Sequence, residues 1–598
     1  MKRYLIILFL ISIFHFPVIG QVVYEPVANN PVYDLLDELA TLKIISINSA
    51  VKPYSRVYIA EKLKEADQRT SGPADTLKSK LVSKRLKDEI RFYLRDYAFE
   101  LGIRNEEPER SGARRSQLGV SGSKLKVQGS KSQVSDFGSQ ISDSSTQDSL
   151  NNNYPLSIIH YPLFNYDPIS FNLTTKPFKL SLRPTVGARY IVNENSHVWD
   201  VSGGGELFGY VGKHIGYYVN VKQTWQNEAL VKPEYFTLEE GKVWRDAGNG
   251  SVANTEWRGG VSVAWKWGDF GVYKDRPIWG NGVHGTNILS GHAPPFPFIQ
   301  LHVKPAKWIE FWYIQGMLTT DYFKKVEEKD TAGKYDVSHQ KKFIVANMVS
   351  VYPWKELSLS VGNSIIYTSD HILPAFLIPD QFFKATDQTV HTMNYANAGY
   401  NNQLFIGADL RLFRHLHVWF MAYIEDIKMS ALWAADQLNE LGYKTGFRLS
   451  NFPFRNLFLT AEYTRTNPLT YRHLVVPTEF YSGNYCLGDY MRDDSQEIFI
   501  SLCFKPYRTL QVDLSYNYSE HGIDYLHPEK VNNYLLPFIG ENNYQKNSVA
   551  ATAILRIFNN LTGSISYAWQ NVKGDVKYSP EIYLGRTNTL MAGIKLGF

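Results

Sequence analysis

Segments in which apolar and polar side chains alternate follow one another along this chain from about Lys179 onward. In 561–569 the odd positions are Leu, Gly, Ile, Tyr and Trp, whereas the even positions are Thr or Ser apart from one Ala, and 511–518 and 416–424 repeat the pattern. Successive side chains of a β-strand point to opposite faces, so this period predicts strands with one apolar and one polar face. No apolar run after Gln21 approaches the roughly 18–20 residues that a spanning helix needs. Many alternating segments of about ten residues match the tilted strands of a membrane barrel.

The connections between these segments predict how many strands there are. Eight tight connections each join two alternating segments, and together with a first strand near 179–192 and a last strand at 589–598 they give eighteen strands. They lie at Gly212–Gly216, Trp267–Asp269, Pro305–Lys307, Tyr352–Lys355, Phe413–His415, Asn451–Arg455, Lys505–Arg508 and Phe558–Asn560. The other connections are longer and rich in Asn, Asp, Gly, Tyr and Lys. Short turns at one end and long loops at the other are typical of outer-membrane barrels. A soluble, secreted sandwich or propeller is the alternative.

Composition agrees with a barrel and excludes other classes. Aromatic residues make up 14% of the 598 residues, while the mean hydropathy is only −0.28. Many aromatic side chains in a chain that is polar on average are typical of a strand wall with one apolar face and one face in contact with water. A net charge of +5 over this length gives no argument for a nucleic-acid partner. Two cysteines, Cys486 and Cys503, are too few for a disulfide scaffold or a multi-cysteine metal site, and whether they pair stays open.

The N-terminal part divides into three regions. Residues 1–20 begin with Lys2 and Arg3 and continue with an apolar run, which predicts a secretory signal peptide and therefore an exported protein. Residues 21–110 are expected to form a helical bundle on the periplasmic side. Residues 111–153 are rich in Ser and Gly and are expected to be a flexible linker or insertion. The barrel is then expected to occupy residues 154–598.

Three amphipathic helices are predicted within 21–110. Asn30 can cap the first, whose first position would be Pro31, and Ser55 can cap the second. The third is predicted from Leu77 to Leu101, with apolar residues at spacings near three and four.

One segment carries a family resemblance. Asp275-Arg276-Pro277-Ile278-Trp279-Gly280-Asn281-Gly282, then His284-Gly285, Asn287-Ile288-Leu289-Ser290 and Ala293-Pro294-Pro295-Phe296-Pro297, resemble the central motif of the Wzi-type capsule assembly family. Pro31-Val32-Tyr33, Leu35-Leu36 and Tyr54-Ser55-Arg56 resemble the N-terminal helical region of that family. The resemblance covers about residue 28 to the C-terminus, and the Ser-rich segment departs from it.

The resemblance implies a function and a location. The protein would be a lectin in the outer membrane of a Gram-negative bacterium that helps attach or assemble capsule at the cell surface. Its partners would be capsular or other surface polysaccharide, outer-membrane lipid and a capsule export machinery. It implies no enzyme activity, cofactor or metal. A porin or gated solute channel is the alternative, motivated by the strand count, because barrels of this width otherwise leave a water channel.

Aromatic residues in the predicted long loops are the candidate ligand contacts. Flat rings can lie against the C–H faces of sugars, whereas the competing interpretation places such rings in interfacial girdles or loop packing. The candidate ligand-binding residues are Tyr235, Trp244, Trp279, His284, Tyr395 and Tyr485. The candidate structural motif, expected to build a plug or rim, consists of Asp275, Arg276, Gly280, Gly282, Gly285, Pro294, Pro295, Phe296 and Pro297.

A third hypothesis is an outer-membrane hydrolase, but the sequence offers no catalytic pattern. The cluster Asp493-Asp494-Ser495 with Glu497 is interpreted as a solvated loop face. No nucleophile-elbow spacing or paired-carboxylate context accompanies it. His284, His292 and His302 are close in sequence but lack the carboxylate and histidine neighbours of a metal site.

Overall fold

The computed structural model describes residues 22–28, 30–48, 50–71, 82–101, 169–175, 177–321, 323–327, 336–387, 400–427, 439–525, 536–558 and 560–597. The predicted signal peptide, the Ser-rich segment 111–153 and Tyr395 lie outside these residues. Within the described ranges, no helix combines the length and the apolar character needed to cross a bilayer.

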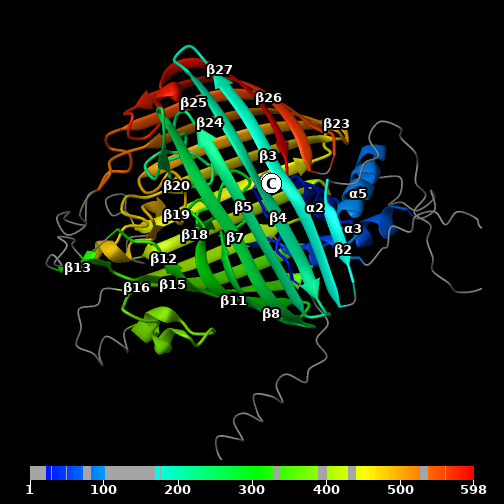
Figure 1. The fold of residues 1–598 in the computed structure, drawn as a ribbon, viewed down its shortest axis with the longest axis horizontal. Coiled ribbons are helices and arrows are strands. Elements are labelled where there is room, and N and C mark those ends of the chain that lie inside the picture. Colours follow the sequence, from blue (N-terminus) through cyan, green and yellow to red (C-terminus); the bar gives the residue numbers. More distant parts are fainter. Residues whose placement is uncertain are drawn as a thin grey trace, which may run out of the picture. The chain divides into compact units, whose positions relative to one another are not determined.

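Eighteen long antiparallel strands form a closed barrel, as predicted (Figure 1). They are β3 (Phe178–Val192), β4 (His197–Val211), β5 (Ile215–Gln226), β7 (Ser251–Trp265), β8 (Gly268–Asp275), β11 (Phe296–Ala306), β12 (Ile309–Leu318), β15 (Lys342–Trp354), β16 (Leu357–Thr368), β17 (Asn401–Leu410), β18 (Leu416–Asp426), β19 (Glu440–Ser450), β20 (Leu457–Thr466), β23 (Ser495–Tyr507), β24 (Leu510–His521), β25 (Tyr544–Arg556), β26 (Leu561–Gly574) and β27 (Gly585–Leu596). The barrel closes where β27 pairs with β3, from Leu590 against Val192 to Leu596 against Val186.

Short elements accompany the barrel strands. Strand β2 (Phe171–Thr174) extends the wall by pairing with the first part of β3, and β6 (Arg245–Gly248) pairs with the beginning of β7. The other short elements in the described residues are β1 (Val51–Lys52), β9 (Ile278–Trp279), β10 (Leu289–Ser290), β13 (Phe323–Glu327), β14 (Asp336–His339), β21 (Tyr481–Ser482), β22 (Tyr485–Cys486), η1 (Pro374–Phe376), η3 (Val476–Thr478) and η5 (Glu581–Tyr583).

All eight predicted tight connections join consecutive, paired barrel strands. They lie at one end of the barrel, which we call the short-turn end, and the opposite end carries the long loops. One connection at the long-loop end differs from the prediction, because residues 193–196 alone link β3 to β4. There the side chain of Asn193 accepts the backbone N–H groups of Asn195 at 3.0 Å and Ser196 at 3.2 Å. This side-chain turn replaces a longer loop.

The barrel wall is apolar outside and polar inside. Outward residues such as Val261 and Ile565 are 53% and 57% exposed, while the inward neighbours Ser262 and Ser566 are 1% and 7% exposed. The same alternation recurs around the wall, with exposed Val272, Val361, Leu514 and Ile594 at outward positions. An apolar outer band is what a barrel presents to lipid.

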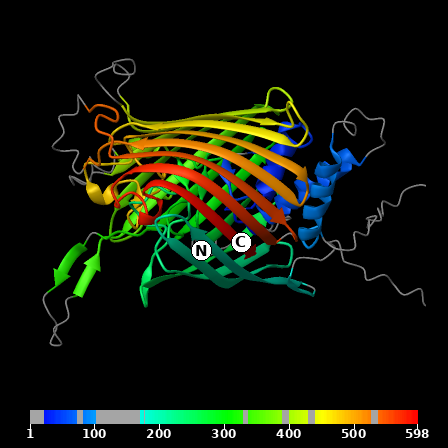
Figure 2. The same cartoon turned by 90° about the horizontal axis from the view of Figure 1, so that it is seen from above.

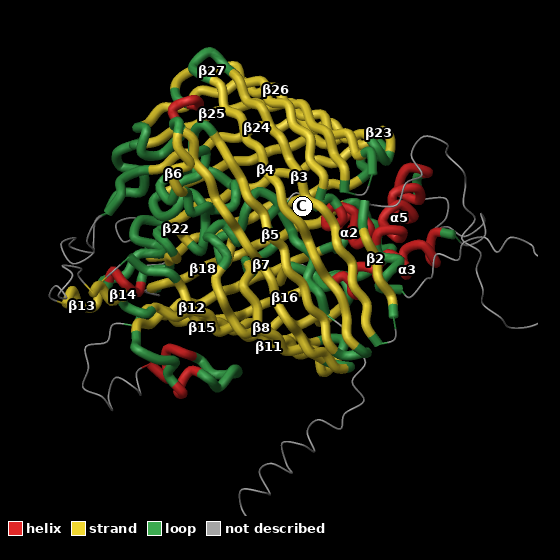
Figure 3. The backbone as a smooth tube through the Cα atoms, in the orientation of Figure 1, coloured by secondary structure: helices red, strands yellow, loops and turns green. Residues whose placement is uncertain are grey.

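Residues 369–387, which we call the outer flap, cover part of this outward face. Phe376 and Phe383 of the flap are buried in one cluster with Tyr313, Phe343, Val345, Ile365 and Tyr367. Neighbouring residues of β12, β15 and β16, such as Ile314, Ile344 and Ile366, belong instead to the lumen cluster, so the flap lies on the opposite, outer side of the wall (Figure 3).

Two asparagines hold the outer flap against the wall. The side-chain amide of Asn347 donates to the carbonyls of Pro379 at 2.8 Å and Gln381 at 2.9 Å. The side-chain oxygen of Asn363 accepts the backbone N–H of Phe383 at 2.9 Å. Polar side chains on the outer face of a barrel are thus satisfied by backbone groups and not left toward lipid.

In the described part of the chain before the barrel there are three helices, α2 (Val32–Thr41), α3 (Arg56–Thr70) and α5 (Lys84–Asp96), shown in blue in Figure 2. Ser55 caps α3 as predicted and accepts the N–H of Tyr58 at 3.2 Å. Helix α2 begins at Val32, one residue later than predicted, so Pro31 holds the cap position and Asn30, one residue further out, accepts the N–H of Val32 at 3.2 Å. The third helix begins at Lys84 behind its cap Ser83, later than predicted, and 72–81 lie outside the described residues.

The helices pack on one another and on the short-turn end of the barrel. Their core is fully buried and consists of Val32, Leu35, Leu36, Leu39, Ile59, Ala60, Leu63, Ala66 and Ile90, among others. Helix carboxylates pair with inward-facing cations of the wall near the short turns. These pairs are Asp34 with Arg448, Asp37 with Arg411, Asp96 with Arg183 and Glu89 with Lys505.

We expect Ile565→Arg to destabilise the barrel by about 2–4 kcal/mol, because the guanidinium would face the bilayer interior. Thr562→Arg on the same strand, whose side chain points into the lumen, should cost much less. The measurement is the free energy of unfolding by urea in phospholipid vesicles. Equal losses for the two variants would contradict the assignment of the two faces.

Candidate functional site

The segment 276–295, between β8 and β11, crosses the lumen and forms a small sheet there. Its strand β9 is the centre of three antiparallel strands, with β1 of the N-terminal region on one side and β10 on the other. Trp279 pairs with both Val51 and Leu289, and the N–H of Gly280 donates to the carbonyl of Ala50 at 2.8 Å. The N-terminal region and the family-like segment therefore form one structure inside the barrel, which we call the plug sheet.

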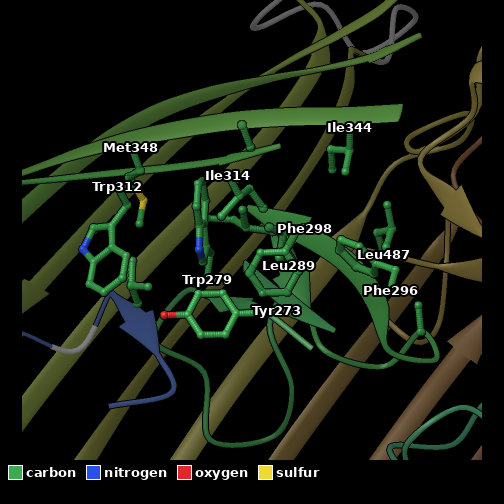
Figure 4. Packing of buried hydrophobic residues seen from close by; sticks show 14 of the residues in the cluster. Tyr273, Trp279, Leu289, Phe296, Phe298, Trp312, Ile314, Ile344, Met348 and Leu487 are labelled. Atoms are coloured by element: carbon green, nitrogen blue, oxygen red, sulfur yellow. The ribbon is translucent and has the colours of Figure 1, made fainter. Parts of the chain in front are cut away.

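Trp279 is the centre of the apolar packing in the lumen. Its indole is fully buried among side chains from the plug sheet and from the wall (Figure 4). These neighbours in the cluster include Tyr273, Leu289, Phe298, Trp312 and Ile314, and the ring of Phe405 meets the indole edge-on at 6.4 Å. In this structure no face of Trp279 is available to a ligand.

Arg276 fixes the start of the segment. Its guanidinium makes two 2.7 Å contacts with the carboxylate of Glu256 and donates to the carbonyls of Ala293 at 3.1 Å and Gly241 at 3.0 Å. The backbone N–H of Arg276 donates to Asp275 at 2.8 Å. Arg276 thereby joins both ends of its own segment to residues 227–244, the loop between β5 and β7.

Two neighbouring carboxylates of the loop 227–244 stay ionised. Burial alone would raise the pKa of Glu240, but Arg276 and Arg258 hold the pKa of that carboxyl at about 2. Arg189 likewise outweighs burial and holds the pKa of Glu239 at about 2. The loop is thus anchored by charge-assisted contacts.

The turn 282–285 lies against charged residues of the wall. The backbone N–H groups of Val283 and His284 donate to the carboxylate of Glu462 at 2.8 and 2.6 Å, and Lys444 donates to the carbonyl of His284 at 2.5 Å. A side chain at Gly282 would lie 1.7 Å from the carbonyl oxygen of Gly285, so only glycine fits. The turn acts as a small anion receptor that Glu462 occupies.

His284 is held by ring and carboxylate contacts. Its Nδ1 lies 2.8 Å from Glu497, and its ring stacks on Phe499 at a centroid distance of 4.0 Å. Tyr490 also donates to Glu497. These contacts explain the orientation of His284 without a ligand.

A third loop, residues 467–494 between β20 and β23, closes over the plug sheet. Tyr471 donates to the carbonyl of Asn287 at 2.8 Å, and the N–H of Ser290 donates to the carbonyl of Leu487 at 2.8 Å. We call the three segments 227–244, 276–295 and 467–494, together with β1, the plug. Figure 3 shows loop backbone, in green, among the yellow barrel strands.

Two of the predicted ligand residues, Tyr485 and Trp244, contact the same lysine, and Tyr485 is buried at 2% exposure. Tyr485 donates to the carbonyl of Lys242 at 2.8 Å, and the ammonium of Lys242 lies 5.6 Å from the ring centroid of Trp244. Trp244 donates to the carbonyl of Val231 at 2.6 Å and remains half-buried. Tyr235, in the same loop, is buried at 8% exposure and carries Lys232 over its ring at 5.1 Å.

The rest of the predicted structural motif leads into the wall. Pro294 and Pro295 are half-buried, and Phe296 and Pro297 begin β11, where they pair with Asp275 and Lys274. The φ angles of Gly280 and Gly285 are +119° and +81°, a region that side chains disfavour.

The interpretation of Asp493, Asp494 and Glu497 as a solvated loop face is wrong. All three are at most 2% exposed. Asp494 accepts the N–H groups of Ile523 at 3.0 Å and Ile539 at 2.8 Å. Asp493 pairs with Arg472 at 3.4 Å. The carboxylates are buried because they fasten the loops that fold inward, a need that a local polar run does not reveal.

Two wall residues of this site, Lys444 and Glu462, were not predicted from the sequence, and Glu497 was predicted only as part of a solvated loop. They occupy inward positions of β19, β20 and β23, where a charged side chain must find a partner inside the lumen. Charged residues at the inward phase of the alternation are the signal that could have revealed them.

A cavity of about 810 Å³ remains between the plug and the helices, and we call it the chamber. It lies along β3–β5 and β24–β27, and its inner limits include Asn281 and Val283 of the plug and Pro31 and Asp34 of the helical region.

No cysteine or metal chemistry is assembled in the described part of the chain. Cys486 and Cys503 are both buried free thiols, and burial raises the pKa of Cys486 well above its ordinary value. Among the same residues, no three His, Cys, Asp or Glu side chains are grouped so that they could hold a metal ion.

An eighteen-stranded antiparallel barrel with an apolar outer face and a protein-filled lumen defines this protein as a membrane β-barrel. The family pattern of the capsule assembly protein Wzi matches residues 188–580, more than half of the chain. The chain therefore belongs to the Wzi capsule assembly family.

One solved structure agrees with the fold along nearly the whole chain. The chain is similar to Wzi, an outer membrane protein that is involved in group 1 capsule assembly in Escherichia coli and is described as a carbohydrate-binding β-barrel. The TM-score is 0.50 and the identity 11%, and the alignment covers 97% of this chain and 99% of the Wzi chain. OccD3 (OpdP) of Pseudomonas aeruginosa gives a TM-score of 0.40 at 12% identity, covering 71% and 92% of the two chains. OccAB2 of Acinetobacter baumannii gives 0.39 at 11% identity, covering 70% and 97%. No curated protein sequence matches this chain.

We expect the plug to loosen in acid through His292. Burial lowers the pKa of His292 to about 4 from an ordinary value of 6.5. Between these values the opened plug binds more protons than the closed plug, so the free energy of opening should fall by about 3 kcal/mol as the pH drops from 7 to 4. Amide hydrogen exchange of residues 276–295 at pH 7 and pH 4 measures this free energy of opening.

His292→Gln should remove most of this pH dependence, whereas the control His197→Gln, at an exposed position, should leave it intact. An unchanged pH profile in His292→Gln would refute the assignment.

Proposed function

We propose that this protein is an outer-membrane lectin that binds a surface polysaccharide at the long-loop end and helps attach capsule to the cell. The observation that carries the proposal is membership of the Wzi capsule assembly family across residues 188–580. The plug supports it, because a barrel whose lumen is filled by its own loops is better suited to binding at its surface than to passing solutes.

The proposed orientation places the short-turn end in the periplasm. Outer-membrane barrels have short periplasmic turns and longer extracellular loops. The helices α2, α3 and α5 would then close the periplasmic mouth, and the half-buried Trp244 would face the capsule at the long-loop end. A capsule export machinery would be a partner on the periplasmic side.

The proposed contact surface is centred on Trp244. Its half-buried ring, the neighbouring cation Lys242 and the exposed Arg245 combine an apolar face with positive charge. Flat rings suit sugar C–H faces, and the cations would attract acidic sugars, chiefly by speeding their approach. Tyr395 and His284 remain candidates with less support.

The proposal is tested by the partition of surface polysaccharide between cells and medium. A strain without this gene should still make polysaccharide but release it into the medium, and restoring the gene should restore attachment. Attachment that is unchanged in the deletion strain would refute the proposal.

Trp244→Ala should restore attachment only in part and weaken polysaccharide binding by the purified protein about fivefold, as expected for about 1 kcal/mol of ring contact. The matched control is Trp267→Ala, because Trp267 is an exposed tryptophan at the short-turn end. Equal effects of the two substitutions would remove Trp244 from the contact surface.

A solute channel is the competing function, and conductance separates the two. We expect the full chain to pass little or no steady current in planar bilayers, because the plug occupies the lumen. A large and steady single-channel current would favour the channel.

A further inference from the structure

The chamber is lined by an excess of positive charge. Seven lysine and arginine side chains and five carboxylates border it. The cations are Lys52, Arg189, Lys222, Lys242, Arg448, Arg556 and Lys595, and the carboxylates are Asp34, Asp37, Asp200, Glu239 and Glu240. Its volume, about 810 Å³, lies within the range of small-molecule sites.

Each of the five carboxylates already has a cationic partner. Asp34 and Asp37 pair with Arg448 at 3.1 and 3.2 Å. Asp200 and Glu239 pair with Arg189 at 2.8 and 2.6 Å. Glu240 lies 3.6 Å from Arg276 and from Arg258. Every carboxylate that borders the chamber is therefore already paired with a cation.

Four of the cations have no such partner. Among the described residues, no carboxylate oxygen lies within 4.0 Å of the charged nitrogens of Lys52, Lys222, Arg556 or Lys595. Arg556 is 5% exposed, and its guanidinium donates to Gln511 while its Nε has no hydrogen-bond partner. Cations held in a confined space without counter-charge are costly unless an anion joins them.

The wall between two of these lysines is built from small residues. Lys595 pairs with Gly187 across the β27–β3 seam, and Lys222 pairs with Gly204 of β4. The hydroxyls of Ser202, Thr562 and Ser564 border the same space. Glycines leave room between the two ammonium groups, and hydroxyls offer hydrogen bonds to a polar ligand.

We propose that the chamber is a binding site for a small polyanion that carries two or more carboxylate or phosphate groups, such as an acidic oligosaccharide. Lys222, Lys595, Lys52 and Arg556 neutralise its charges, and the serine and threonine hydroxyls hydrogen-bond its remaining oxygens. The site lies behind the plug and differs from the proposed polysaccharide surface around Trp244, with which it shares Lys242.

Titration calorimetry on the full chain in detergent micelles tests this, with trigalacturonate, inorganic phosphate and the neutral maltotriose as probes. Trigalacturonate should bind saturably, and a response to phosphate alone would identify phosphate groups as the ligand chemistry. Each of Lys222→Gln and Lys595→Gln should weaken binding about tenfold. The control Lys266→Gln, at an exposed turn, should have no effect.

A measurement on the unaltered chain supplements the variants. The bound anion should protect Lys222 and Lys595 from acylation by an amine reagent, whereas Lys266 should react at the same rate with and without it. Binding of neither anion, equal binding of maltotriose, or unchanged affinity in the double variant Lys222→Gln, Lys595→Gln would overturn the proposal.

Discussion

The charge pairs between the barrel wall and the segments inside it hold this structure together. An eighteen-stranded barrel has an interior too wide for its own wall side chains to fill. Here the wall supplies inward cations such as Arg411 and Arg448, and α2 supplies the matching carboxylates Asp37 and Asp34. At the other end, Arg276 of the plug meets Glu256 of the wall. Without these pairs, each side would bury uncompensated charge.

The lumen is divided into two unlike halves. Along β8, β11, β12 and β15–β18, the plug residue Trp279 packs among bulky wall side chains such as Trp312 and Phe405. Along β3–β5 and β24–β27, glycine, serine and threonine border the chamber. One side of the barrel therefore anchors the inserted segments, and the other side borders the chamber. This division links the two proposals, because a rigid plug can present outer loops while a cavity persists behind it.

The sequence was sufficient for the local elements and insufficient for long-range contacts. Alternation and turn residues predicted the strands and all eight short turns, because both signals are local. Ser55 was predicted as a cap for the same reason. The pairing of Val51 with Trp279 could not be predicted, since no local pattern records which strand meets a two-residue strand far away in the chain. Burial of Asp493 and the position of the outer flap depend likewise on tertiary packing.

The seam between β3 and β27 has a consequence for how the molecule is made. Strand β3 pairs with β27, which follows every other barrel strand in the sequence, so the wall cannot be sealed before β27 is in place. Contacts between such distant residues form late and slowly. Strand β1 must pair with β9 inside that wall. A late seam gives the N-terminal region time to enter from the side, before the ring shuts around it.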